Sequence, residues 1–273
     1  MAVGAASDPT GRSSDPTGAA SGPASQAPDP MLVSAAAMVF VDDPAVPVLE
    51  MADIRHLVEV LRLRPGELVI TSDGSGSWAP CRVSPDIPGH RSRDLDPASV
   101  LVPDGPTRLQ APTGPEVTVA FAPVKGDRPE WVVQKLTELG VDRIVPIHTG
   151  RSVVRWDGDR ADRAVDRLRR VAREASAQCR RARWPEVTPV SPLSALATLT
   201  GMAPSLAHPG GGRVSLARPV IAIGPEGGWD ANELENGDPL VGLGPTVLRA
   251  ETAAVVAGTL LCSLRAGVIG RVA

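Results

Sequence analysis

The sequence has no tyrosine and only two phenylalanines, and its cysteines are limited to Cys81, Cys179 and Cys262. The cysteines lie far apart and follow neither a CxxC nor a Cys/His spacing, so we expect no disulfide and no metal site. The shortage of aromatic rings argues against an RNA-binding sheet on which several bases stack. No apolar run reaches the roughly 20 residues that span a bilayer, and no signal peptide is recognisable. We therefore expect a cytoplasmic protein that binds neither membrane nor metal.

Lysine and net positive charge are also scarce. Lys125 and Lys135 are the two lysines, and the formal net charge is −3. The protein as a whole does not attract nucleic acid, so any binding of RNA must rest on a local group of arginines. The sequence contains no GxGxxG, P-loop or GxSxG motif, which disfavours a dinucleotide-dependent oxidoreductase, a nucleotide triphosphatase and a serine hydrolase.

The composition divides the chain into four segments. Residues 1–30 are small and polar and repeat the sequence SDPTG, so we predict a disordered tail. Residues 31–84 combine short β-like runs with one amphipathic helix, and they predict a small β-rich domain. Residues 85–116 are rich in Pro, Gly and Asp and are predicted to form a linker or long surface loop. Residues 117–273 form the last and largest segment.

In this last segment, apolar strands alternate with helices, which predicts an α/β domain with a parallel sheet covered on both faces. The predicted strands are residues 117–124, 143–148, 220–223 and 240–243, with a weaker one near Leu206. The predicted helices are residues 127–140, 159–178 and 251–266. Two loops follow predicted strands directly and each contains Gly-Pro: residues 223–228 read IGPEGG, and residues 243–249 read LGPTVLR. Ligands of open parallel sheets bind beyond the carboxyl ends of strands, so the loops either form one binding site or simply make turns.

The helix predicted at 159–178 is rich in arginine. Arg160, Arg163, Arg167 and Arg170 lie on one of its faces and apolar residues on another. This pattern indicates either a solvated helix face or a surface that contacts phosphates. Arginines just beyond the helix and a second basic group in the β-rich domain are the candidate RNA-binding residues: Arg180, Arg181, His56, Arg62 and Arg64.

Several blocks in this order resemble the bacterial 16S rRNA uridine-N3 methyltransferases of the SPOUT superfamily. The blocks are KGDR at 125–128, QKLTELGV at 134–141, IGPEGGW at 223–229 and LGPTVLRAETA at 243–253. Residues 56–67 also resemble the PUA-like domain of that family. The resemblance implies a trefoil-knotted C-terminal domain, a small N-terminal PUA-like β-barrel, S-adenosylmethionine as cofactor, the small ribosomal subunit as substrate and a homodimer with the cofactor site near its interface.

The resemblance also implies which residues form the site. The implied cofactor-binding residues are His148, Thr149, Ile223, Gly224, Pro225, Gly227, Gly228, Leu243, Gly244, Leu248 and Arg249. Arg249 and Arg151 are candidates for stabilising an anionic uracil, because methylation at N3 requires that nitrogen to lose its proton. Glu226 and Glu251 are either bases or structural residues. Two alternatives remain open: a ribose 2′-O methyltransferase of the same superfamily, and a non-catalytic RNA-binding protein of ribosome assembly.

Overall fold

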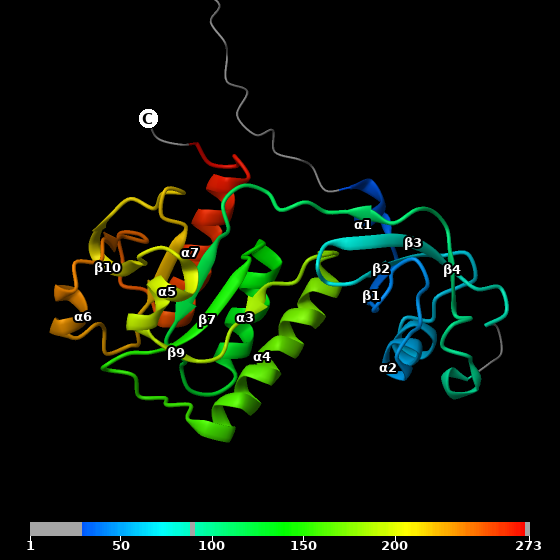
Figure 1. Ribbon diagram of the computed structural model, residues 1–273, viewed down its shortest axis with the longest axis horizontal. Coiled ribbons are helices and arrows are strands. Elements are labelled where there is room, and N and C mark those ends of the chain that lie inside the picture. Colours follow the sequence, from blue (N-terminus) through cyan, green and yellow to red (C-terminus); the bar gives the residue numbers. More distant parts are fainter. Residues whose placement is uncertain (1–28, 88–90, 271–273) are drawn as a thin grey trace, which may run out of the picture.

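In the computed structural model, which describes residues 29–87 and 91–270, two sheets lie at opposite ends of an elongated molecule (Figure 1). The sequence-predicted disorder of residues 1–30 concerns a segment that lies outside these ranges, apart from Asp29 and Pro30. Asp29 accepts a hydrogen bond from the N–H of Met31 at 2.9 Å and caps the short helix α1 (Pro30–Ser34).

The N-terminal sheet has the strand order β1-β2-β3-β4, and β5 also pairs with β3. The strands are β1 (Ala37–Phe40), β2 (Leu68–Ser72), β3 (Ser77–Val83), β4 (Leu101–Pro103) and β5 (Arg108–Leu109). β1 runs parallel to β2, and the other pairs are antiparallel. The predicted helix begins as α2 (Met51–Arg55) and continues as the π-helical turn η1 (His56–Val60), while η2 (Ser92–Asp94) is a 3₁₀ turn. Ile54 and Leu57 are buried and attach α2 and η1 to the sheet.

The segment predicted as a linker contributes two strands to this sheet. β4 and β5 both lie within residues 85–116, and their partner β3 was not predicted either. Pro80 interrupts the apolar pattern of β3, and Pro and Gly surround β4 and β5. Such short strands are stabilised by pairing with a neighbour, which composition alone does not reveal.

The C-terminal sheet is parallel, as predicted, with the order β12-β10-β11-β6-β7-β8 and with β9 also paired to β7. Its strands are β6 (Thr118–Phe121), β7 (Arg143–His148), β8 (Glu186–Val187), β9 (Ser191–Pro192), β10 (Ser205–Gly212), β11 (Val220–Ile223) and β12 (Leu240–Val241). Val119 and Phe121 pack toward one face and Ala120 toward the other. Both faces are therefore buried, which matches the continuous apolar runs of the sequence.

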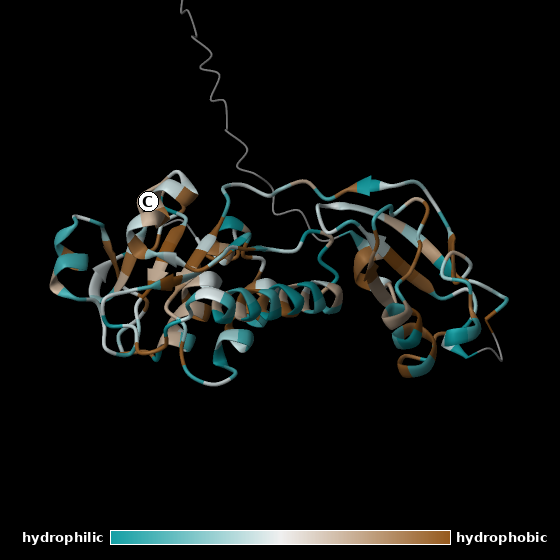
Figure 2. Ribbon diagram, turned by 60° about the horizontal axis from the view of Figure 1, so that its bottom comes forward, coloured by the Kyte–Doolittle hydropathy of each residue, from teal (hydrophilic) through white to brown (hydrophobic). Residues whose placement is uncertain are grey.

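Helices α3 (Arg128–Leu139), α4 (Gly158–Gln178) and α7 (Ala250–Arg265) cover one face. The other face is covered by η3 (Leu193–Ala195), α5 (Leu196–Thr200), α6 (Ala231–Glu235) and the ring of Trp229. α3 ends where predicted, because Gly140 adopts φ +94° and its N–H bonds back to the helix. Figure 2 shows the apolar strands inside and a hydrophilic outer face along α4.

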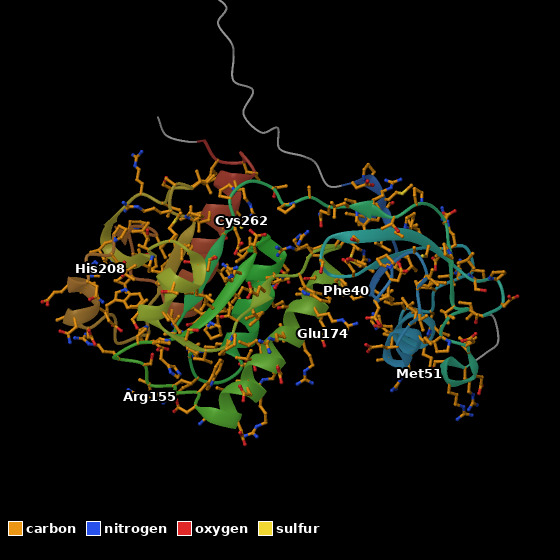
Figure 3. All side chains as sticks on the ribbon, viewed as in Figure 1. Phe40, Met51, Arg155, Glu174, His208 and Cys262 are labelled. Carbon is orange, nitrogen blue, oxygen red and sulfur yellow. The ribbon has the colours of Figure 1, made fainter. Side chains whose placement is uncertain are left out.

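Residues 180–184 join the two parts of the molecule. The main-chain oxygen of Ala182 accepts hydrogen bonds from Ser72 Oγ at 2.8 Å and from the N–H of Gly76 at 3.1 Å. Phe40, the last residue of β1, lies near the end of α4 (Figure 3), and its ring centroid is 4.6 Å from that of Trp184. The C-terminal end of α4 is thereby fixed to β1.

In the described residues, no helix is long and apolar enough to cross a bilayer. The same part of the chain contains no group of His, Cys, Asp and Glu side chains placed to hold a metal ion.

Candidate active site

The two Gly-Pro loops meet at the carboxyl edge of the C-terminal sheet and enclose a cavity of about 530 Å³. The first loop leaves β11 and the second leaves β12. Between these strands lies β10, whose middle residues Ala207, His208 and Pro209 contribute to the cavity wall. A volume of this size lies within the range of roughly 300–1,000 Å³ that is usual for small-molecule sites. The loops therefore form one site rather than two separate turns.

Glycines keep the main chain of both loops open. Gly228 has φ +70° and Gly244 has φ +155°, and a Cβ on either would meet no atom within 4 Å. At Gly224, by contrast, a Cβ would lie 3.1 Å from the ring of Trp229. That ring is buried and fixed by a hydrogen bond of 2.9 Å from its Nε1 to the oxygen of Ala207. The first loop thus packs its own tryptophan beneath the cavity.

The second loop supplies unused hydrogen-bond donors. Within residues 29–87 and 91–270, no hydrogen bond uses the main-chain N–H of any residue from 246 to 252. This segment leads into the N-terminus of α7, where Ala250 and Ala253 form part of the wall. Free N–H groups and a helix N-terminus favour a carboxylate. The adjacent apolar wall, which includes Ile223, Leu243 and Leu248, suits a flat ring system. The residues present therefore fit S-adenosylmethionine, which has both groups.

Three charged side chains reach the cavity wall from different segments. Arg249 is the exposed residue that precedes α7, Glu226 is exposed on the first loop, and Arg151 comes from the loop after β7. Arg151 donates a hydrogen bond of 3.0 Å from Nη1 to the oxygen of Gly227 and is thereby held against the first loop. Glu251 points elsewhere: it pairs with Arg128 at 3.3 Å, between the first turns of α3 and α7. The structure thus gives Glu251 a structural contact and leaves Glu226 at the cavity.

Not every sequence-predicted cofactor residue lines this cavity. Those that do are Ile223, Gly224, Pro225, Gly228, Leu243, Gly244, Leu248 and Arg249. His148 instead accepts a hydrogen bond from the N–H of Trp156 through Nε2 at 3.3 Å. Thr149 is buried in a turn closed by Ser152, and Gly227 lies against Arg151. The side of the cavity that His148 and Thr149 do not reach is formed by the middle of β10.

Comparisons with known proteins identify the family. A family model described as an RNA methyltransferase domain matches residues 111–262, and one described as an RNA methyltransferase PUA domain matches residues 49–86. Ribosomal RNA small subunit methyltransferase E of Mycobacterium tuberculosis is 36% identical to the chain over 234 residues, which cover 79% of this chain and 86% of that protein. The chain belongs to the ribosomal RNA small subunit methyltransferase E family.

Solved structures agree with this assignment to the methyltransferase E family. A probable rRNA methyltransferase from Porphyromonas gingivalis has a TM-score of 0.69 and 27% identity, covering 85% of this chain and 100% of that one. Methyltransferase E from Neisseria gonorrhoeae, solved with bound S-adenosyl methionine, has a TM-score of 0.65 and 27% identity, covering 84% and 97%. The predicted family, SPOUT-type α/β domain and PUA domain are thereby confirmed.

Part of the cavity wall was not predicted from the sequence. Trp229 is buried and also contributes to the cavity wall. The other unpredicted residues of the wall are Ala207, His208, Pro209, Leu234, Thr246, Val247, Ala250 and Ala253. β10 has only a weak strand pattern, so the sequence did not indicate that its residues line the cavity. Figure 3 shows His208 at the β10 end of the molecule.

Two predicted RNA-binding residues of this chain make contacts within the protein instead. Arg180 adopts φ +60° and donates through Nη2 to the oxygens of Ala35 and Ala36 at 3.2 and 2.7 Å. Arg181 donates through Nη1 to the oxygen of Val141 at 2.7 Å and pairs with Asp142 at 3.2 Å. Burial lowers the pKa of the Arg181 guanidinium, and Asp142 partly offsets that effect. Both guanidinium groups hold the fold together, so we exclude them from the RNA surface.

The other predicted RNA-binding residues remain accessible. His56, Arg62 and Arg64 are exposed on η1 and the turn that follows it, and Arg62 has φ +54°. They lie in the N-terminal part of the chain, apart from the cavity. Their role in binding RNA stays a prediction.

Proposed function

We propose that this chain transfers a methyl group from S-adenosylmethionine to N3 of a uridine in 16S ribosomal RNA. The observation that carries the proposal is the single cavity between the two Gly-Pro loops, at the sheet edge where such ligands bind. Family membership supports both the cofactor and the substrate, since the relatives are named as small subunit rRNA methyltransferases. The rRNA substrate also supports the prediction of a cytoplasmic protein.

The cofactor is held by residues that line the cavity. Ile223, Leu243 and Leu248 supply the apolar surface for its adenine, and Gly224, Gly228 and Gly244 let the main chain approach it. The free N–H groups before α7 and in its first turn bind its carboxylate. When bound, the cofactor supplies an electrophilic methyl group on sulfur, so no metal is needed for this step.

The charged residues at the rim act on the uracil. Arg249 and Arg151 supply two guanidinium groups for the negative charge that develops as N3 loses its proton. Cations close to the developing charge stabilise the anion in the transition state. Glu226 is a carboxylate in the cavity wall, and in this proposal it accepts the N3 proton, either directly or through a water molecule. Alignment of N3 with the methyl group contributes further, by up to roughly 7–11 kcal/mol in ideal cases.

We further propose a homodimer, a trefoil knot in residues 117–273 and a PUA-like unit that begins at residue 31. The family resemblance supports all three. Pairing of β4 and β5 with β3 indicates that the PUA-like unit extends beyond the predicted boundary at residue 84. The target uridine has to be unstacked or single-stranded for N3 to be reached.

Methyl transfer from tritiated cofactor to unmodified small subunits tests the function. We expect Arg249→Ala to lower the rate by about 100-fold or more, as is typical when a group that stabilises developing charge is removed. The matched control is Arg213→Ala, which changes an exposed arginine that does not line the cavity. An Arg249→Ala variant that is folded and as active as the control would remove Arg249 from the mechanism.

Mass spectrometry of the modified nucleoside separates the alternatives. A methyl group on the uracil base supports the proposal, whereas one on the ribose would make the chain a 2′-O methyltransferase. A non-catalytic RNA-binding protein would show no binding of S-adenosylmethionine in calorimetry.

A further inference from the structure

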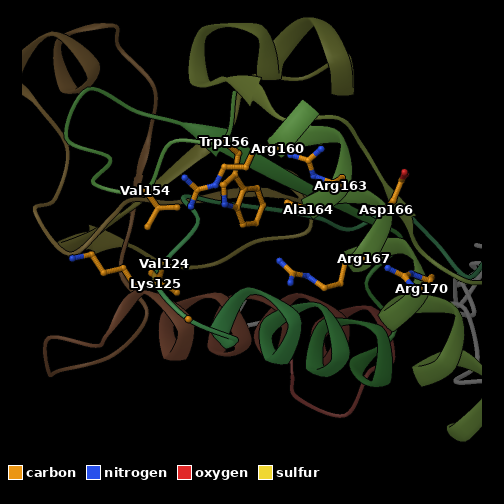
Figure 4. A pocket seen from close by; sticks show the side chains of 11 residues that line it. Val124, Lys125, Val154, Trp156, Arg160, Arg163, Ala164, Asp166, Arg167 and Arg170 are labelled. Carbon is orange, nitrogen blue, oxygen red and sulfur yellow. The ribbon is translucent and has the colours of Figure 1, made fainter. Parts of the chain in front are cut away.

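A second cavity, of about 620 Å³, lies along the N-terminal half of α4 (Figure 4). We call it the α4 groove. Its walls come from α4, from the loop after β6 and from the loop after β7. α4 lines it with Arg160, Arg163, Arg167 and Arg170, and the loop after β6 adds Lys125.

The α4 groove is strongly basic. Its wall contains Lys125 and the four arginines just named, against the single carboxylate of Asp166. That carboxylate pairs with Arg169 at 3.1 Å, and Arg167 pairs with Glu130 at 2.6 Å. Among the described residues, Lys125, Arg160, Arg163 and Arg170 are exposed and make no ion pair or side-chain hydrogen bond. Four unpaired cations thus face one groove on a chain whose net charge is −3.

The arrangement of these cations is linear. At a rise of about 1.5 Å per helical residue, Arg160 and Arg170 are separated by about 15 Å along α4. At about 3.4 Å per nucleotide of one helical strand, this distance corresponds to about four nucleotides. Lys125 lies at one end of the groove and Arg170 at the other (Figure 4). A row of phosphates fits such a line of guanidinium groups better than a single small anion does.

The α4 groove is continuous with the candidate active site through one loop. In the loop after β7, Arg151 lines the first cavity, whereas Val154 and Trp156 line the groove. The strands β11, β6 and β7 are neighbours, so their following loops share one edge of the sheet. From there α4 leads to β1 of the N-terminal sheet, where Arg173 donates a hydrogen bond of 3.1 Å to the oxygen of Phe40.

We propose that the α4 groove binds the sugar-phosphate backbone of the rRNA strand next to the target nucleotide. This inference rests on the proposed function, because it assumes an RNA whose target base occupies the first cavity. Four ionic contacts of this kind make RNA binding dependent on salt. For a single strand, a plot of log K against log salt concentration falls with a slope of about 0.7 for each phosphate contacted. Contacts to phosphates position a strand without selecting its sequence.

The test compares two double variants with the same net charge. Arg163→Gln/Arg170→Gln removes two groove cations, and Arg213→Gln/Arg218→Gln removes two exposed arginines near β10 and β11. Fluorescence anisotropy measures binding of a labelled single-stranded 16S rRNA fragment that contains the target uridine, at 0.05 to 0.3 M salt. We expect the groove variant to bind about tenfold more weakly near 0.15 M salt, with a salt slope smaller by about 1.4.

Calorimetry with S-adenosylmethionine, in the same variants, keeps the two proposals apart. We expect the groove variant to bind the cofactor as tightly as the unchanged protein. Equal RNA affinity and equal salt slope in the two double variants would overturn the groove proposal, and would leave an acidic protein as the partner to test. Failure of the unchanged protein to bind cofactor or to methylate rRNA would instead overturn the proposed function.

Discussion

Asp142 is the residue whose replacement most directly tests the structural role assigned to Arg181. Its carboxylate pairs with Arg181 at 3.2 Å and with Arg265 at the end of α7, and it accepts a hydrogen bond of 2.9 Å from the N–H of Val117. One side chain therefore links the start of β6, the turn before β7, the end of α7 and the segment after α4. Asp142→Asn keeps the shape of the side chain and removes its charge.

The loss of stability can be worked out from burial. The side chains of Arg181 and Arg265 are only 13% and 10% exposed, so each would lose its counter-charge inside the protein. Leaving a buried charge without its partner costs about 3–5 kcal/mol. Asp142 itself is 25% exposed, so we expect the lower end, about 3 kcal/mol. For a chain of this size, that lowers Tm by roughly 6–12 °C.

Urea and thermal unfolding, followed by circular dichroism, measure this loss. The matched control is Asp104→Asn, which breaks the pair with Arg82 at 2.7 Å between side chains that are 49% and 43% exposed. An exposed pair of this kind contributes about 1 kcal/mol or less. If Asp142→Asn lost no more stability than Asp104→Asn, the buried network would not hold the fold, and Arg181 would return as a candidate for binding RNA.

Two further predictions concern the cavity wall and the response to pH. Gly211→Ala would place a Cβ 2.4 Å from the main-chain carbon of Val241 and push β12 away from β10. Because the loop after β12 lines the cavity, we expect the affinity for S-adenosylmethionine, measured by calorimetry, to weaken by about tenfold or more. Gly212→Ala is its control, since its Cβ would lie at an ordinary 3.7 Å from Leu240, and equal affinities would contradict the packing argument. Burial raises the pKa of the Cys262 thiol to about 11, although Arg265 opposes this effect. As pH rises, the unfolded chain therefore loses the thiol proton before the folded protein does, so the free energy of unfolding falls between about pH 9 and about pH 11. We expect Cys262→Ala to reduce this fall in urea titrations. An unchanged fall would show that Cys262 does not cause it.

The sequence predicted the C-terminal sheet well because its signals are local. A continuous apolar run marked β7 at Arg143–His148, and Gly140 marked the end of α3. The strands β3, β4 and β5 were missed because they depend on pairing with each other rather than on their own pattern. A parallel sheet was predictable, but its strand order was not.

In the candidate site too, features with a local sequence pattern were predicted and those that depend on long-range pairing were not. The sequence identified both Gly-Pro loops, because each follows an apolar strand. The contribution of His208 and Pro209 was missing, because it depends on β10 lying between β11 and β12. The opposite error occurred at Arg181, since its partner Asp142 lies 39 residues away and no local pattern reveals it. Long-range pairing therefore decides which arginines are bound within the protein.

A crystal structure of the chain with S-adenosylmethionine tests the central claim most directly. We predict electron density for the cofactor between residues 223–229 and 243–249, with its carboxylate near the start of α7. Density for the cofactor at another place, or an empty cavity at saturating cofactor, would contradict the account.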